Sequence, residues 1–187
     1  MYDYAQLVDR EHLLCPHYIP DDLKLVNVPF PCQVPTDDLR RFLKKEAAVY
    51  VQEMFKAAAK EKISLFAISG FRSYKRQSVL YQRNPNGAVA FPGASEHQLG
   101  LALDVSTPDV ALELTEEFEF TQAGKWVAAY GPLYGFILRY PKRKTSITGI
   151  PYEPWHLRYV TKNLALYLTL TGMTLDEYHI HFSKKKE

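Results

Sequence analysis

Two short segments of the chain contain residue types that can bind a metal ion and support hydrolysis. The first segment holds His97 and Asp104, and the second holds His156. A catalytic zinc site takes three protein ligands from His, Asp, Glu and Cys and leaves one position for water. Gly100 lies between His97 and Asp104 and allows a bend that brings both side chains to one point. The spacing therefore predicts a site with two imidazoles and one carboxylate.

Glu153 stands three residues before His156, in the sequence Glu-Pro-Trp-His. A carboxylate that lies beside a metal without binding it can take a proton from the attacking water and pass it to the leaving amine. Glu153 is therefore the candidate catalytic base.

Each of these residues also has a purely structural interpretation. A single histidine near a strand is usually a hydrogen-bonded structural residue, an aspartate at a strand end usually caps or faces water, and a glutamate before a proline is usually exposed. The residue types alone leave these alternatives open. The remaining histidines are weaker metal candidates because no third ligand accompanies them: His12, His17, His179 and His181.

A long helix is expected in the first third of the chain. Thr36, Asp37 and Asp38 predict its start, because a threonine cap and early acids satisfy the first N–H groups and the positive end of the helix dipole. Apolar residues follow at helical spacing as far as about Lys60. We interpret that apolar stripe as core.

Shorter elements follow this helix in an irregular order. Buried strands are expected at residues 63–69, 101–106, 135–140 and 155–160. Shorter helices are expected at 74–82, 121–130 and 164–170, with a last one from about residue 174. Residues 83–96 predict a long loop, which in a compact domain is more often functional than idle. Residues 142–150 predict a hairpin.

Helices thus bracket a central group of strands without the regular alternation of a doubly wound fold. We expect an α+β fold, a single domain with a small, mostly antiparallel sheet flanked by helices. Residues 1–35 are rich in Pro, Asp and His and show little periodicity, so we expect an N-terminal extended arm packed on the domain. Residues 36–187 then form the catalytic domain.

The composition excludes several classes of protein. The 187 residues are 47% hydrophobic and 24% charged, as in an ordinary globular protein. The net charge of +2 is too small to indicate a nucleic-acid partner, and the tail 184–186 is the only lysine cluster, which we expect to be solvated. No run approaches the roughly 18 apolar residues that span a membrane.

The compartment and the redox state stay open. The N-terminus shows no basic segment followed by an apolar one, so no signal peptide is visible. We expect either a cytoplasmic protein or a domain separated from its export signal. Cys15 and Cys32 lie in a Pro-rich stretch and could form a disulfide or remain two reduced thiols.

The pattern around the candidate ligands extends well beyond them. Ser-x-His-x-x-Gly-x-Ala-x-Asp at 95–104 precedes Glu-x-x-His at 153–156. Other segments in the same order are 69–74 with Gln77, 134–136 with 139–141, and 154–160. Over about residues 18–172, this set resembles the VanY-type D-alanyl-D-alanine carboxypeptidases. Their wider group includes VanX dipeptidases, some phage endolysins and the signalling domain of hedgehog proteins.

The resemblance implies one zinc ion per chain, held by His97, Asp104 and His156, with Glu153 as general base. Arg72 resembles the family arginine that faces the scissile carbonyl, where a guanidinium would stabilise the oxyanion; its alternative is a surface arginine in a turn. The resemblance also implies residues that contact the terminal D-amino acid or wall the cleft, of which the last two could equally be core: Ser95, Gln77, Ser73, Tyr134 and Trp155.

The activity implied by the resemblance is zinc-dependent removal of the terminal D-alanine from peptidoglycan stem peptides or their precursors, as a D,D-carboxypeptidase. An L,D-carboxypeptidase acting on tetrapeptide stems is the alternative, because the two differ only in the penultimate residue. A non-catalytic zinc-binding recognition module is less favoured, since it has no chemical need to keep Glu153 and Arg72 together. We expect a stem peptide as partner, a monomer, and a place at the cell wall if an export signal once preceded the chain.

Overall fold

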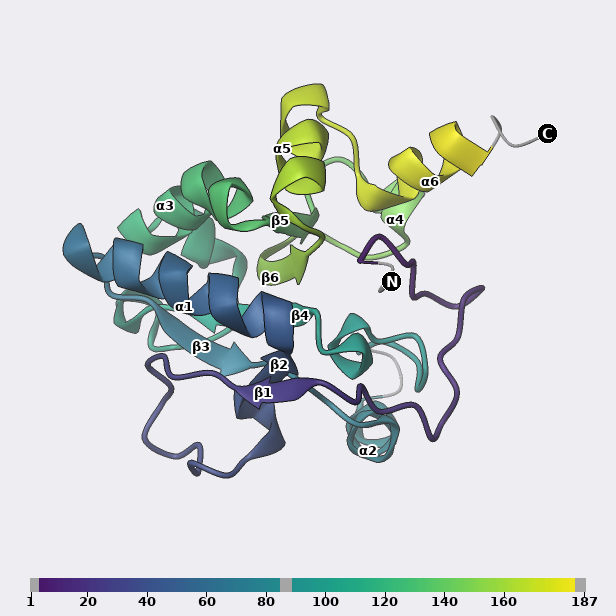
Figure 1. Ribbon diagram of the computed structural model, residues 1–187, viewed down its shortest axis with the longest axis horizontal. Helices are drawn as coiled ribbons and strands as arrows, with labels where there is room; N and C mark the ends of the chain where they lie inside the picture. The colour runs from purple at the N-terminus through teal and green to yellow at the C-terminus, as the bar shows by residue number, and fades with distance from the viewer. Residues whose placement is uncertain (1–3, 85–88, 184–187) are drawn as a thin grey trace.

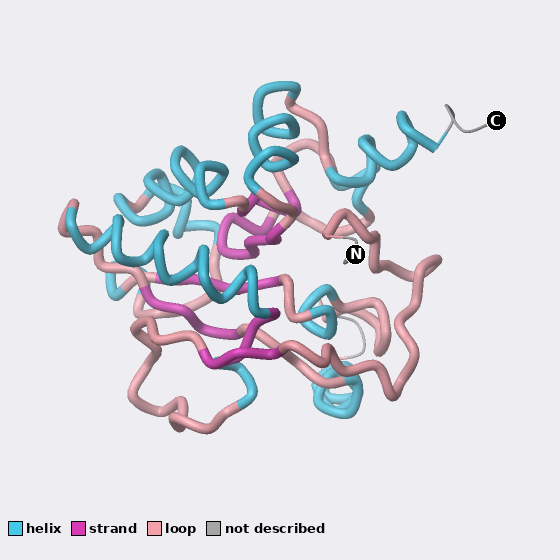
Figure 2. The backbone as a smooth tube through the Cα atoms, in the orientation of Figure 1, coloured by secondary structure: helices cyan, strands magenta, loops and turns pink. Residues whose placement is uncertain are grey.

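The computed structural model describes residues 4–84 and 89–183, with a sheet at its centre and helices around it (Figures 1 and 2). The four-stranded sheet has the order β3-β4-β6-β5, and all neighbouring strands are antiparallel. Its strands are β3 (Phe66–Ser69), β4 (Ala102–Ser106), β5 (Phe136–Tyr140) and β6 (Glu153–Tyr159). A two-stranded sheet pairs β1 (Leu23–Leu25) with β2 (Phe42–Lys44). The expected α+β fold is confirmed.

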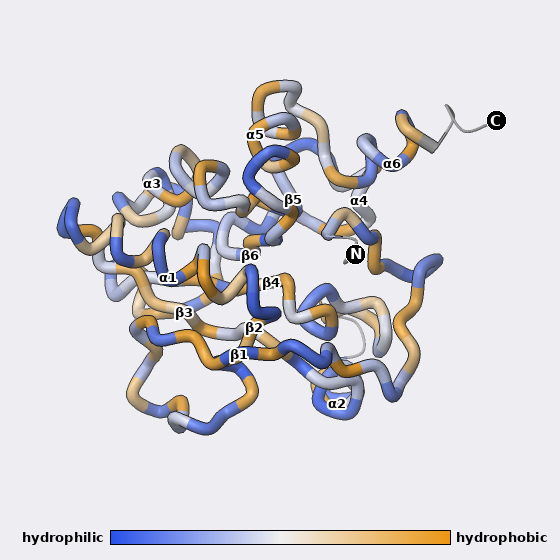
Figure 3. The backbone as a smooth tube through the Cα atoms, in the orientation of Figure 1, coloured by the Kyte–Doolittle hydropathy of each residue, from blue (hydrophilic) through white to orange (hydrophobic). Residues whose placement is uncertain are grey.

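Helix α1 (Lys45–Lys60) lies across one face of the main sheet (Figure 1). Figure 3 shows both hydrophobic and hydrophilic stretches along it, as the amphipathic spacing predicts. Its buried residues, such as Val51 and Met54, share one core cluster with strand residues such as Leu103. The other helices are α2 (Tyr74–Arg83), α3 (Gln122–Tyr130), α4 (Thr145–Thr148), α5 (Lys162–Thr171) and α6 (Leu175–Ser183).

The two faces of the main sheet have different contents. Side chains alternate along a strand, so Leu103 and Leu157 face the core while Asp104 and His156 face the other way. Leu103 pairs with Leu157 and Asp104 pairs with His156 in the β4–β6 register. One face of the sheet therefore supplies packing, and the other presents polar side chains.

The predicted start of the long helix at Thr36 is wrong. The helix begins at Lys45, after a 3₁₀ turn at Leu39–Arg41 and strand β2. Asp38 does act as a cap, but of the 3₁₀ turn, where its side chain accepts the N–H of Arg40. The backbone of this stretch is used in long-range pairing with β1 and with the turn after β3, and tertiary pairing overrides the helical spacing.

The predicted hairpin at 142–150 is also wrong, because this stretch contains the short helix α4. Its local bonds run from the N–H groups of Thr148 and Gly149 to the carbonyls of Lys144 and Thr145. Gly149 ends the helix with a φ of 71°, in the left-handed region. The other expected strands and helices are confirmed with boundaries moved by a few residues. The lysine tail 184–186 lies outside the described residues.

The chain before Thr36 packs on the domain at several points. Val8, Val26 and Phe30 are buried in the main core cluster. The boundary at residue 35 stays a prediction. Cys15 and Cys32 are free and exposed. Among the described helices, none has the length and apolar character to cross a bilayer.

Candidate metal centre and active site

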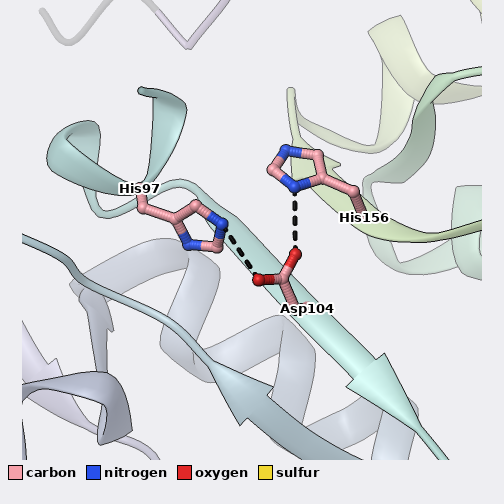
Figure 4. A group of neighbouring side chains, drawn as sticks. All are labelled: His97, Asp104 and His156. Carbon is pink, nitrogen blue, oxygen red and sulfur yellow. Dashed lines mark hydrogen bonds and ion pairs between the residues drawn. The ribbon is translucent and has the colours of Figure 1, made fainter. Parts of the chain in front are cut away.

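The three predicted metal ligands meet at one point on the polar face of the sheet (Figure 4). Asp104 on β4 lies directly opposite His156 on β6. His97 comes from the 3₁₀ turn Glu96–Leu99, which Gly100 ends with a φ of 69°. One ligand atom from each residue lies within 4.8 Å of those of the other two. The predicted bend at Gly100 therefore brings His97 back over the strand that carries Asp104.

Asp104 sits between the two imidazoles. His97 Nε2 lies 3.2 Å from Asp104 Oδ2, and His156 Nδ1 lies 3.0 Å from Asp104 Oδ1. Burial alone would raise the pKa of Asp104, but the two histidines hold it well below its usual range. The carboxylate therefore stays charged, as a metal ligand must.

The donor set fits a zinc ion. Two imidazole nitrogens and one carboxylate oxygen are common zinc ligands, and all three side chains are buried. His97 Nδ1 donates to the Gly70 carbonyl at 2.7 Å, which leaves Nε2 turned toward Asp104. A second partner of this kind fixes the tautomer of a metal-binding histidine. His97, Asp104 and His156 could therefore hold a metal ion.

Glu153 lies beside these three residues at the start of β6. Its Oε2 is 3.8 Å from His156 Nδ1, and its side chain is only 13% exposed. Burial raises the pKa of Glu153 to about 7, and the charge of Asp104 also raises it, against the opposing effects of His156 and Arg72. A carboxyl group that titrates near neutral pH is suited to both accept and return a proton.

Arg72 enters the site from the turn after β3. Its guanidinium donates to Gln77 Oε1 and to Ser69 Oγ, each at 3.1 Å, and its NH2 lies 3.6 Å from Asp104 Oδ2. Its backbone N–H also donates to the His97 carbonyl. These contacts hold a positive charge at the edge of the metal centre, so the surface-residue interpretation of Arg72 does not describe its position.

Gln77 and Ser73 occupy supporting positions around Arg72. The Gln77 side chain is fully buried, accepts from Arg72, and donates to the Ala90 carbonyl at 2.6 Å. Ser73 caps α2 by accepting the N–H of Arg76. Direct contact of Gln77 or Ser73 with a substrate stays a prediction. The observed contacts of Gln77 orient Arg72.

A cavity of about 270 Å³ covers the metal centre. Ser95, Trp155, Arg72 and Glu153 line it together with the three predicted ligands. A second cavity of about 500 Å³ has Arg72, Asp104 and Ser73 in its wall. The two cavities thus share Arg72 and Asp104 in their walls, next to the three predicted ligands.

The two aromatic candidates lie in different places. Trp155 is half-buried and lines the cavity over the metal centre. Tyr134 packs against the main core and stacks on Trp126 with ring centres 6.4 Å apart. A cleft role for Tyr134 stays a prediction, and its packing agrees with the core alternative.

Two residues of the cavity wall were not among the sequence candidates. The buried ring of Tyr140 lies 5.0 Å from the ring of His156. Glu96 is buried beside His97 and lies 3.5 Å from His156 Nε2. A signal for Glu96 was present, because Arg139 and Arg158 each lie between apolar or aromatic neighbours in a strand and require a buried acid.

The chain is similar in sequence to one family of known proteins. The model of the VanY family, D-alanyl-D-alanine carboxypeptidase, matches residues 40–162. Over 97% of its length, the chain is 44% identical to YodJ of Bacillus subtilis, of which it spans 67%.

Two solved structures are similar in fold as well as in sequence. The LdcB LD-carboxypeptidase superposes with a TM-score of 0.86 at 44% identity, over 92% of this chain and 83% of that chain. A mutant of the D,D-pentapeptidase VanY from a VanB-type vancomycin-resistance cassette, solved in complex with Zn(II), superposes with a TM-score of 0.70 at 28% identity, over 95% of this chain and 99% of that chain.

Proposed function

Because the chain belongs to the VanY family of D-alanyl-D-alanine carboxypeptidases, we propose that it is a zinc-dependent carboxypeptidase that releases the terminal D-alanine of peptidoglycan stem peptides. The observation that carries this proposal is the convergence of His97, Asp104 and His156 beside Glu153 in one cavity. The Zn(II) complex of a similar VanY enzyme supports zinc as the metal.

His97, Asp104 and His156 hold the ion, which when bound supplies a Lewis acid and makes a water molecule more acidic. Glu153 takes a proton from the water that attacks the peptide carbonyl. Glu153 then passes that proton to the amine of the departing D-alanine as the C–N bond breaks.

Arg72 stabilises the negative charge that develops on the carbonyl oxygen during the attack. Gln77 and Ser69 hold its guanidinium in a fixed plane, so little reorganisation accompanies the reaction. The Ser95 hydroxyl and the Arg72 guanidinium bind the terminal carboxylate, because charge-assisted hydrogen bonds to a carboxylate are strong. A free C-terminus next to the metal is what distinguishes a carboxypeptidase from an endopeptidase.

The two candidate specificities differ in the residue before the scissile bond. A D,D-carboxypeptidase cuts after a D-residue, as in a pentapeptide stem, and an L,D-carboxypeptidase cuts after an L-centre, as in a tetrapeptide stem. Both the sequence identity and the TM-score are higher with LdcB than with the VanY D,D-pentapeptidase, which favours the L,D form. We therefore propose L,D-carboxypeptidase activity first and D,D-carboxypeptidase activity second.

Incubating the zinc-loaded protein with matched tetrapeptide and pentapeptide stems tests this choice. We expect the tetrapeptide to lose D-alanine faster than the pentapeptide. Faster release from the pentapeptide would establish the D,D form instead. If neither stem is cut while zinc is bound, the protein is a non-catalytic zinc-binding module.

A further inference from the structure

Four charged side chains form a buried network behind His156: Glu96, Arg139, Arg158 and Asp176. Glu96 and Arg139 are 1% exposed, and Arg158 is fully buried. Removing charges from water is costly unless each has close partners. The network is far more than a surface ion pair, and it lies directly against a predicted metal ligand.

The two carboxylate oxygens of Glu96 have separate partners. Oε1 accepts hydrogen bonds from Arg139 Nε and Arg158 NH1, each at 2.7 Å. Oε2 faces His156 Nε2 at 3.5 Å. Within the part of the chain that the structure describes, neither of these two buried atoms has another hydrogen-bond partner. Buried polar atoms are nearly always paired, so we take these two atoms as partners of each other.

The opposite nitrogen of His156 points to the metal centre. His156 Nδ1 lies 3.0 Å from Asp104 Oδ1, on the far side of the ring from Glu96. A histidine that binds a metal through one nitrogen commonly donates its other N–H to a carboxylate, and this fixes both tautomer and ring orientation. Resting on the proposed metal site, we propose that Glu96 is a positioning residue that accepts the Nε2–H of His156 and so presents Nδ1 to the zinc ion.

The two histidines of the site differ in this respect. His97 donates from Nδ1 to the neutral Gly70 carbonyl and keeps Nε2 for the metal. His156 faces the charged Glu96 through Nε2 and keeps Nδ1 for the metal. A carboxylate partner makes the imidazole more basic, so His156 should be the stronger metal ligand of the two histidines.

The far end of the network provides a matched control. Asp176 on α6 accepts hydrogen bonds from Arg139 at 2.6 Å and 3.1 Å. Glu96 faces His156 directly, whereas Asp176 is connected to it through Arg139 and Glu96. Glu96→Gln and Asp176→Asn each remove one carboxylate charge that pairs with Arg139. Only Glu96→Gln changes the partner of His156.

The experiment measures zinc affinity by competition with a chromogenic chelator. We expect Glu96→Gln to weaken zinc binding roughly 10- to 100-fold and Asp176→Asn to stay within about threefold of the native protein. The assignment is overturned by a Glu96→Gln protein with native zinc affinity, or by an equal loss in Asp176→Asn. A native protein that binds no zinc overturns the metal site together with this assignment, whereas native binding with an unaffected Glu96→Gln variant overturns only the role of Glu96.

A second measurement needs no variant and therefore does not depend on folding of the mutants. In long-range ¹H–¹⁵N spectra of the zinc-loaded native protein labelled at histidine, we expect His156 to carry its proton on Nε2 and His97 to carry its proton on Nδ1. A proton on Nδ1 of His156 would overturn the proposal.

Discussion

The two sides of the metal centre are built in different ways. On one side, Asp104 and His156 come from neighbouring strands whose antiparallel register places them opposite each other. On the other side, Arg72 and Ser95 lie in turns, and side-chain contacts hold Arg72 in place. The ladder of backbone hydrogen bonds makes the strand side stiff, while the turn side can change sequence without disturbing the sheet.

This difference suggests a division of roles. Glu153 belongs to the strand side because it lies on β6 with His156. The residues that we propose to stabilise the oxyanion and bind the terminal carboxylate belong to the turn side. Substitutions on the strand side should therefore stop the chemistry. On the turn side, where the metal ligand His97 is the exception, substitutions of Arg72 and its supporting residues should weaken it in steps.

The largest effect is expected for Glu153→Gln. The amide keeps the shape of the side chain but cannot accept the proton, so turnover should fall roughly 100- to 10,000-fold. Zinc content, measured on the same preparation, should stay native because Glu153 is not one of the three ligands. Turnover above about a tenth of the native rate would rule out Glu153 as the base.

A smaller loss is expected for Arg72→Lys. A compact ammonium cannot make the paired contacts to Gln77 and Ser69 while facing the carbonyl oxygen. Loss of one oxyanion donor costs roughly 100- to 1,000-fold in kcat. Arg83→Lys, the same change at an exposed position on α2, serves as the control. Unchanged turnover in Arg72→Lys would show that Arg72 has only a structural role.

Gln77→Ala should have a moderate effect that depends on Arg72. The change removes a hydrogen bond to a charged group, which costs roughly 1.5–3 kcal/mol, or about tenfold or more in rate. In the double variant with Arg72→Lys, the loss should be less than the product of the two single losses, because both residues act as one unit. Independent, multiplying losses would mean that Gln77 acts on the substrate directly.

The smallest effect is expected for Tyr134→Phe. Tyr134 stacks on Trp126 and packs on the core, so loss of its hydroxyl should leave turnover within about twofold. Steady-state kinetics on the stem peptide checks this. A tenfold rise in KM would instead place Tyr134 in the cleft, as the family resemblance allows.

The strand side of the site was predictable only in part. The motif spacing identified Asp104 and His156, but they lie 52 residues apart in the chain and meet because β4 pairs with β6. That pairing skips β5, and no local pattern specifies which strand lies next to which. The geometry therefore came from the structure and the residue identities from the sequence.

Long-range contacts also explain the errors. The apolar spacing of residues 39–44 is compatible with a helix, but β1 and the turn after β3 capture this backbone. Glu96 escaped notice because an acid between Ser95 and His97 has no local mark of burial. The arginines in β5 and β6 carried the usable signal, since a cation that lies between apolar or aromatic neighbours in a strand requires a buried anion.

The central claim is that this cleft binds a peptide by its free C-terminus next to the metal. The most direct measurement is mass-spectrometric detection of cleavage by the zinc-loaded protein of one tetrapeptide stem, supplied as the free acid and as the C-terminal amide. We predict that the acid loses D-alanine and that the amide loses no D-alaninamide, because Arg72 and Ser95 lose their anionic partner. Equal cleavage of both peptides would contradict the carboxypeptidase assignment and indicate an enzyme that cuts within the stem.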